Sequence, residues 1–321
     1  MSIRLSQRRW RISSGDLVAD VDLAHGGKIR ALRSRRSGRN FLFHDPRRNP
    51  RGEKYLEHDI SGWDECFPTV GASAAPQALD HGVLWRTPWH GQRFERQLVT
   101  KVVKPNGMPV MLTRIITPME SNRLLFDYTF LNLSREPLPF IYSSHPILAV
   151  DPDSRIRLSH IRQLLVLGQN GRLKSGRRQP WPVATETDGT TVRLDTHFTP
   201  DRQLAGKWFA KTPGPALVTF PRTGEALRWT WDAEKLPYLG IWLSLGIPLD
   251  ERHPDPEQWI CAALEPCTSK RDLLEPEHSL QLLPGEPYSF WIQVELLSPR
   301  RQARRLRRWL GGKWLPLKRR P

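Results

Sequence analysis

The chain has 321 residues, of which 38% are hydrophobic and 26% charged, enough for one large domain or two ordinary ones with a self-sufficient core. Its three cysteines, Cys66, Cys261 and Cys267, cannot all pair, and no CxxC or similar metal spacing occurs. A disulfide scaffold and a zinc-finger architecture are therefore excluded, and a reducing, cytoplasmic setting is expected. No apolar run approaches the roughly 20 residues of a membrane helix, and the basic start lacks the apolar stretch of a secretory signal.

The formal net charge of +16 is concentrated at the carboxyl-terminal end. Residues 298–321 carry ten Arg or Lys residues and no acid, which leaves a net charge of +6 for residues 1–297. That is an ordinary balance for a globular domain. The excess charge therefore characterises a basic tail and indicates little about the main domain.

The predicted elements of the main domain are short strands separated by turns. Gly and Pro together make up 51 of the 321 residues and fall at short intervals, as they do between strands. Alternation or β-branched and aromatic enrichment predicts strands at 17–23, 28–32, 124–133, 227–231 and 288–297, with a turn at Gly26-Gly27 before the second of them.

Helical periodicity of any length is confined to 301–310, where one face is apolar, the other carries arginines, and Gly311-Gly312 follows. No internal repeat or composition break divides 1–297. We therefore expect one all-β domain over 1–297, built as a large β-sandwich, and a short basic helix or tail over 298–321.

Several common catalytic designs are missing from the sequence. It contains no GxGxxG, GxxxxGK[ST], HExxH or GxSxG motif, so nucleotide hydrolysis, dinucleotide redox chemistry and the commonest zinc-protease and serine-hydrolase designs lose most of their support. Acid–base chemistry by His, Asp and Glu remains.

Four segments carry polar residues within sequence that otherwise predicts strands and turns. They are 61–69 (SGWDECFPT), 80–89 (DHGVLWRTPW), 132–146 (NLSREPLPFIYSSHP) and 264–268 (LEPCT), the last preceded by 237–242 (PYLGIW). With the Gly26-Gly27 turn and 37–40 (SGRN), their order and spacing resemble those of the aldose 1-epimerases of the galactose mutarotase-like superfamily, over roughly 17–297. The resemblance implies a β-supersandwich with an open carbohydrate-binding face.

The resemblance also implies an acid–base pair. A mutarotase opens a hemiacetal ring and closes it on the other anomeric face, which requires a base for the C1 hydroxyl and an acid for the ring oxygen. By resemblance Glu265 is the base, His145 is the acid, and His81 hydrogen-bonds the substrate. Glu265 follows an apolar run, where an inward carboxylate is costly unless it is used. A Glu and a His on opposite sides of the ring need no metal or nucleotide, so no cofactor is expected.

Four further residues are candidates for substrate binding. Arg86 follows the His-Gly pair as the phosphate-binding Arg does in sugar-phosphate members of the superfamily, although the text HGVLWR is one residue longer. Asp64, like its neighbour Glu65, could bind sugar hydroxyls or cap a turn. Asp195 is a candidate for the sugar-binding Asp that the family carries in mid-chain. Trp242 could stack on a pyranose ring, whereas the alternative for any single Trp is burial in the core.

Two function classes are weighed against each other: a mutarotase acting on a hexose or hexose derivative, and a carbohydrate-binding or regulatory protein that keeps the fold without turnover. The acid–base pair favours the first, and the altered Arg and Asp positions leave room for the second. A small-molecule sugar is the expected partner. Nucleic acid is not expected, because 1–297 contains no basic-aromatic RNA motif or recognition helix.

Three alternatives stay open for the basic tail. Its helix could dock on the sandwich, its mixture of apolar residues and cations could contact an anionic membrane surface, or it could be a disordered solubilising end. No family motif extends into it, so the site is expected not to depend on it.

Overall fold

Antiparallel strands form nearly all the regular structure in the described part of the chain. The computed structural model describes residues 8–47, 54–73, 78–161, 163–167, 176–249 and 251–298. Within these residues the strands form one ten-stranded sheet, one eight-stranded sheet and two short two-stranded ribbons. Every strand pair with a continuous register is antiparallel.

The ten-stranded sheet combines strands from both ends of the chain. In spatial order its strands are β1 (Arg9–Ser14), β2 (Leu17–Asp22), β3 (Lys28–Ser34), β4 (Trp63–Cys66), β10 (Ser143–Ala149), β20 (Ile260–Cys267), β19 (Tyr238–Leu245), β16 (Leu204–Lys211), β12 (Gln163–Leu167) and β13 (Arg178–Pro180). Strands β4, β10 and β20, which are far apart in the sequence, are therefore neighbours at its centre.

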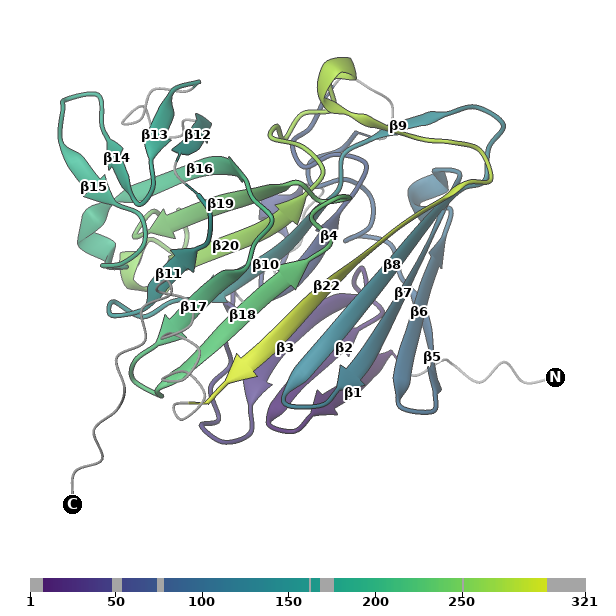
Figure 1. The fold of residues 1–321 in the computed structure, drawn as a ribbon, viewed down its shortest axis with the longest axis horizontal. Helices are drawn as coiled ribbons and strands as arrows, with labels where there is room; N and C mark the ends of the chain where they lie inside the picture. Colours follow the sequence, from purple (N-terminus) through teal and green to yellow (C-terminus); the bar gives the residue numbers. More distant parts are fainter. Residues whose placement is uncertain are drawn as a thin grey trace.

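The eight-stranded sheet is ordered β11 (Arg155–Leu158), β17 (Ala216–Phe220), β18 (Glu225–Trp231), β22 (Pro287–Leu297), β8 (Arg123–Asn132), β7 (Val110–Met119), β6 (Gln97–Val103) and β5 (His90–Phe94). The ribbons pair β14 (Val183–Thr185) with β15 (Thr191–Arg193) and β9 (Leu138–Phe140) with β21 (Leu280–Leu282). Figure 1 shows β22, β8 and β7 crossing in front of the sheet that contains β1, β2 and β3.

Helices are limited to single 3-10 turns in the part of the chain that the structure describes. These are η1 (Tyr55–Glu57), η2 (Pro105–Gly107), η3 (Pro200–Arg202), η4 (Pro256–Gln258) and η5 (Pro276–His278). None of the described helices has the length and apolar character to cross a membrane. The helix predicted over 301–310, with the rest of the tail, lies outside the described residues.

The all-β prediction is confirmed, as are the individual strands that alternation and β-propensity predicted. The predicted strands 17–23, 28–32, 124–133, 227–231 and 288–297 correspond to β2, β3, β8, β18 and β22. In β8 every second side chain is buried, as expected for a strand with one face against a core. The predicted Gly26-Gly27 turn is also present, with positive φ at both glycines.

The main hydrophobic core fills the space between the two sheets. It contains, for example, Trp63 of β4 and Phe126 of β8, whose ring centroids are 4.8 Å apart. A second, smaller apolar cluster covers the opposite face of the ten-stranded sheet. It includes Tyr55, Trp85 and Trp259, with Trp242 packed against it. Both faces of this sheet are thus buried near its centre.

Candidate functional site

The polar residues of interest lie on the face of the ten-stranded sheet that points away from the eight-stranded sheet, here called the site face. In β4, Trp63 packs between the sheets and Glu65 accepts a 2.8 Å hydrogen bond from Tyr128 of β8. Because successive side chains of a strand point to opposite faces, Asp64 and Cys66 lie on the site face. Glu65, considered with Asp64 as a sugar ligand, is instead part of the core.

Strand register gathers the site residues from distant parts of the chain. His145 stands opposite Asp64 in the β10–β4 pair, and Ser143 stands opposite both Cys66 and Cys267. Directly paired residues project to the same face, and so do residues two apart along a strand. Glu265, two residues before Cys267, therefore shares the site face with His145.

His145 and Glu265 are in direct proximity. His145 Nε2 lies 3.7 Å from Glu265 Oε1, and the two residues are 5% and 0% exposed. The sequence-based expectation placed a sugar ring between these groups across an open face. The structure differs, because β10 and β20 are adjacent strands and because the rings of Tyr55 and His81 pack against His145. The acid and base candidates thus approach a substrate from one side.

Lys207 of β16 is the cation of this site, and the sequence analysis did not find it. Its Nζ lies 2.8 Å from Glu265 Oε2 and 2.9 Å from Asp272 Oδ1, and the side chain is 5% exposed. Ser143 donates a hydrogen bond of 3.1 Å to the same Glu265 oxygen. Glu265 Oε2 is thereby held by two donors, whereas the buried Oε1 accepts no hydrogen bond from the described residues.

Asp64 anchors the opposite side of His145 through Tyr55. The Tyr55 hydroxyl donates to Asp64 Oδ2 at 3.0 Å and lies 3.4 Å from His145 Nδ1. Lys28 Nζ lies 3.0 Å from the same Asp64 oxygen. The result is a continuous buried row of polar groups that runs from Lys28 to Lys207 with His145 at its centre.

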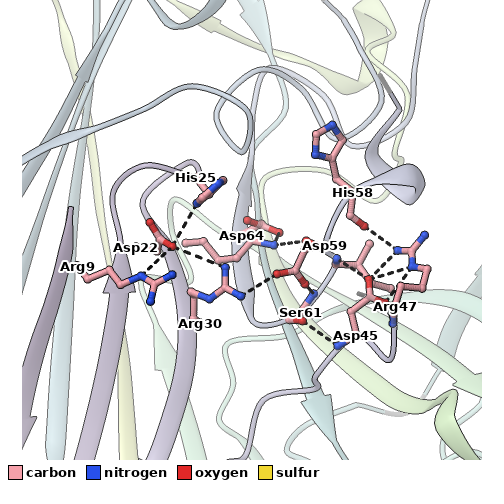
Figure 2. A network of polar contacts seen from close by, with 12 residues as sticks. Arg9, Asp22, His25, Arg30, Asp45, Arg47, His58, Asp59, Ser61 and Asp64 are labelled. Atoms are coloured by element: carbon pink, nitrogen blue, oxygen red, sulfur yellow. Dashed lines mark hydrogen bonds and ion pairs between the residues drawn. The ribbon is translucent and has the colours of Figure 1, made fainter. Parts of the chain in front are cut away.

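The row continues to the protein surface through alternating charges. Lys28 also donates to the Asp59 carbonyl oxygen, and the Asp59 carboxylate binds Arg30 at 3.0 Å. Arg30 lies 3.6 Å from Asp22, which the structure also places near Arg9. Figure 2 shows Arg30 between Asp22 and Asp59, with Asp64 alongside. These contacts fix the edge of the site to β2 and β3.

His81 belongs to the same group of contacts. Its ring stacks on that of Tyr55 with centroids 3.7 Å apart, and lies 5.1 Å from the His145 ring. Its Nδ1 is 3.0 Å from Asp80 Oδ1. The loop that carries it requires Gly82, whose φ is +72° and where an added Cβ would lie 2.0 Å from the Phe67 carbonyl oxygen.

Burial sets the protonation of the central groups. It lowers the pKa of His145 well below the usual value, and His81, Lys207 and Lys28 lower it further by charge repulsion. Burial also raises the pKa of Asp64, although Lys28 opposes this shift. For Lys207, burial disfavours the charge, but Asp272 and Glu265 outweigh it and raise the pKa. Neutral His145 therefore faces a firmly cationic Lys207 across Glu265.

The other candidates lie at varying distances from this centre. Trp242 is half-buried, opposite Lys207 in the β16–β19 register and packed on the second apolar cluster. Arg86 is exposed, with its guanidinium 5.5 Å over the Trp85 ring. Asp195 binds Arg193 at 2.7 Å and lines a separate cavity of about 250 Å³ beside β11. Neither Arg86 nor Asp195 joins the contacts around His145.

The sequence analysis missed five residues of the site: Lys28, Tyr55, Ser143, Lys207 and Asp272. Lys207 offered a signal, because it interrupts the buried run 204–210 just as Glu265 interrupts another. Tyr55 and Asp272 lie in loop segments whose sequence shows no such pattern.

The arrangement can exchange protons, and it can also ligate a cation. The donor atoms of Cys66, His81 and His145 all lie within 4.8 Å of one another, as do those of the exposed group Glu275, Glu277 and His278. Cys66 is a free, buried thiol. A sugar could engage the same polar groups by hydrogen bonds to its hydroxyls.

Comparison with known proteins gives a consistent result for the fold. No protein-family model matches the sequence, and no curated protein does either. Among solved structures, a candidate aldose 1-epimerase from Escherichia coli K12 is 18% identical with a TM-score of 0.66, over 90% of this chain and 99% of that one. A galactose mutarotase-like protein from Lactobacillus casei is 15% identical with a TM-score of 0.65, over 90% and 100%.

A third structure, of a galactose mutarotase related enzyme from Lactobacillus acidophilus, is 13% identical with a TM-score of 0.64, over 91% of this chain and 98% of that one. Identities this low establish shared architecture alone. The polypeptide thus has the fold of the aldose 1-epimerase and galactose mutarotase-like proteins.

Proposed function

We propose that the protein is a mutarotase of the aldose 1-epimerase type, which interconverts the α and β anomers of a hexose or hexose derivative. The single observation that carries the proposal is the proximity of His145 Nε2 and Glu265 Oε1, 3.7 Å apart on the site face. The shared fold of the galactose mutarotase-like structures supports it.

The one-sided placement of the pair suits the reaction. The anomeric hydroxyl and the ring oxygen are bonded to the same carbon, so the groups that serve them must lie close together. Glu265 takes the proton of the anomeric hydroxyl through its free Oε1 while the protonated form of His145, which its lowered pKa makes the minor form at neutral pH, protonates the ring oxygen, and the ring opens. Rotation about the C1–C2 bond and the reverse proton transfers close the ring as the other anomer. All atoms balance without an added reactant.

A substrate must share space with Tyr55 to reach this pair. The Tyr55 hydroxyl lies between Asp64 and His145, where a sugar hydroxyl would find the same acceptor and the same imidazole. We therefore assign Asp64 and His81 to hydroxyl binding, with movement of Tyr55 on entry of the sugar. Trp242 beside the second apolar cluster is the proposed apolar contact of the ring.

A sugar-binding protein without turnover is the second candidate, and Lys207 is the observation that favours it. Its ammonium group pairs with Glu265 at 2.8 Å and so competes with the substrate proton for that carboxylate. The two functions differ in a single property, the rate of anomer exchange.

Polarimetry of freshly dissolved α-glucose and α-galactose separates the candidates. The mutarotase proposal expects the optical rotation to reach equilibrium faster with protein than with buffer alone, in proportion to protein concentration. Sugar binding by calorimetry with no acceleration for either sugar would favour the binding protein instead.

A further inference from the structure

Three side chains of the site carry donor atoms suited to a transition metal. Cys66 of β4, His145 of β10 and His81 of the adjoining loop have donor atoms within 4.8 Å of one another. Cys66 and His145 are buried, and the His81 side chain is 17% exposed. Thiolate and imidazole together select zinc-like ions over magnesium or calcium, which prefer oxygen ligands.

The two imidazoles are oriented as metal ligands are. His81 Nδ1 is held by Asp80 Oδ1 at 3.0 Å, and His145 Nδ1 faces the Tyr55 hydroxyl at 3.4 Å. Each ring therefore has an oxygen partner on Nδ1, and His145 presents Nε2 to Glu265 Oε1. In metal centres such outer partners fix the tautomer and the ring orientation, with the carboxylate–histidine pair as the common form.

Glu265 supplies an independent indication of a ligand. Its Oε1 is completely buried, accepts no hydrogen bond from the described residues, and lies 3.7 Å from His145 Nε2. An unpartnered carboxylate oxygen at this depth is unfavourable unless something binds it. A cation between His145 and Glu265 would satisfy it and complete a set of four donors.

We propose that Cys66, His81, His145 and Glu265 bind one divalent ion of the zinc class, which inhibits the acid–base pair. With metal–nitrogen bonds of about 2.0 Å and metal–sulfur bonds of about 2.3 Å, tetrahedral donors lie about 3.3–3.8 Å apart. The donor atoms of Cys66, His81 and His145, which lie within 4.8 Å of one another, must therefore approach by about 1 Å. His81, on a loop and only partly buried, is the ligand free to make this movement. Binding releases the Cys66 thiol proton to solvent.

The inhibition rests on the proposed function, whereas the metal binding does not. An ion held by His145 Nε2 and Glu265 Oε1 removes both the proton donor and the proton acceptor from use. Turnover of a sugar would then require loss of the ion. The site is thus an inhibitory one, sensitive to the free concentration of zinc.

Titration of the chelator-treated full-length protein with Co²⁺ tests the binding without any sugar. The expected result is one bound equivalent with the visible bands of tetrahedral cobalt and a near-ultraviolet thiolate-to-cobalt charge-transfer band. Cys66→Ser should abolish the charge-transfer band, and Cys261→Ser, which alters a buried free cysteine outside the cluster, should retain it. Retention of the band in Cys66→Ser, or no band in the wild type, would overturn the proposal.

Two measurements guard against misleading outcomes. X-ray absorption of the zinc-loaded wild type needs no variant, and it should show one sulfur and three nitrogen or oxygen neighbours. A sphere without sulfur would place the ion elsewhere, as at Glu275, Glu277 and His278, and contradict the proposal. If the protein turns over sugar, the zinc concentration that halves the metal-free rate should be at least about tenfold lower for the wild type than for Cys66→Ser. If the protein shows no mutarotation, the proposed function is wrong, and the cobalt titration alone decides whether the metal site exists.

Discussion

Lys207 is the residue whose removal should disturb the site most. It is the shared cation of Glu265 and Asp272, and all three side chains are largely buried. A buried ion pair adds little net stability, yet removal of one partner leaves the other charge uncompensated at a cost of about 3–5 kcal/mol.

The first prediction is that Lys207→Met lowers the free energy of unfolding by about 3–5 kcal/mol, because Glu265 and Asp272 lose their common partner. Urea unfolding followed by circular dichroism measures this change. Lys211→Met on the same strand is the matched control: Lys211 is exposed, so its loss should change stability by less than about 0.5 kcal/mol. Equal effects of the two substitutions would mean that the buried pair is not formed.

His145 makes the stability depend on pH in a defined direction. Its pKa is lowered in the folded protein by burial and by His81, Lys207 and Lys28, so the unfolded chain binds its proton more readily. A lowered imidazole pKa stabilises the fold at pH above the unfolded value of about 6.5, and this contribution is lost as the pH falls below it. The other charged neighbours of the ring are Asp80 and Glu265.

The second prediction follows from that sign. Between about pH 6.5 and 5, wild-type protein should lose stability more steeply than His145→Gln, by up to about 1.4 kcal/mol per pH unit for one proton. Thermal or urea unfolding with a metal chelator present, at a series of pH values, gives both slopes. His278→Gln, at a surface turn, should keep the wild-type slope. Parallel slopes for wild type and His145→Gln would show that the ring titrates normally.

At the scale of elements, the loop after the β4 segment places His81 over the sheet. Gly82 forms a bridge with Phe67, and its added Cβ would collide with the Phe67 backbone. This is a close approach of backbone to backbone, which no flexible side chain can relieve. The loop position of His81 thus depends on the absence of a side chain at residue 82.

The third prediction compares two glycines with positive φ. Gly82→Ala should destabilise the protein by at least about 1 kcal/mol more than Gly189→Ala does. Both glycines have a positive φ, +72° at Gly82 and +90° at Gly189, but only at residue 82 do other atoms lie within 4 Å of the new Cβ. Urea unfolding compares them. If the protein is a mutarotase, Gly82→Ala should also raise KM through displacement of His81. Equal stability of the two variants would contradict the packing described for this loop.

The strands of the sandwich were largely predictable from sequence, and particular elements show why. β8 and β22 alternate or are rich in aromatic and β-branched residues over ten and eleven positions, so local pattern suffices. β4 has four residues, all buried, and its text carries no period-two signal. It is a strand because β3 and β10 pair with it, which is a tertiary effect.

The site was predictable only in part for the same reason. His145 and Glu265 stood out through their flanking text, but their mutual distance depends on the adjacency of β10 and β20. Lys207 comes to Glu265 because β16 pairs with β19 and β19 with β20. Sheet order of this kind is a long-range property, and local sequence does not encode it.

At the scale of the whole molecule, charge and site are separated along the chain. Ten of the cations fall in 298–321, whereas every described contact of the site lies within 8–298. The tail itself lies outside the described residues.

The fourth prediction is therefore that deletion of 299–321 leaves the stability of the domain and any sugar turnover per folded molecule unchanged. Binding to anionic liposomes, measured by sedimentation, should fall if the tail contacts membranes, because its cations interact with anionic lipid. Charge-neutral liposomes serve as the control. A truncated protein that stays folded but loses turnover would mean that the tail contributes to the site.

Anomer exchange at equilibrium, followed by NMR for wild type, Glu265→Gln and Glu225→Gln, tests the central claim most directly. Both substitutions remove one buried carboxylate that a cation pairs, but Glu225 lies at 1% exposure beside Ser34 and Arg36, away from His145. We expect fast exchange of a hexose with wild type and Glu225→Gln, and a loss of about a hundredfold or more with Glu265→Gln, as for removal of a catalytic acid or base. Undiminished exchange in folded Glu265→Gln, or exchange no faster than in buffer with the wild type, would contradict the central claim.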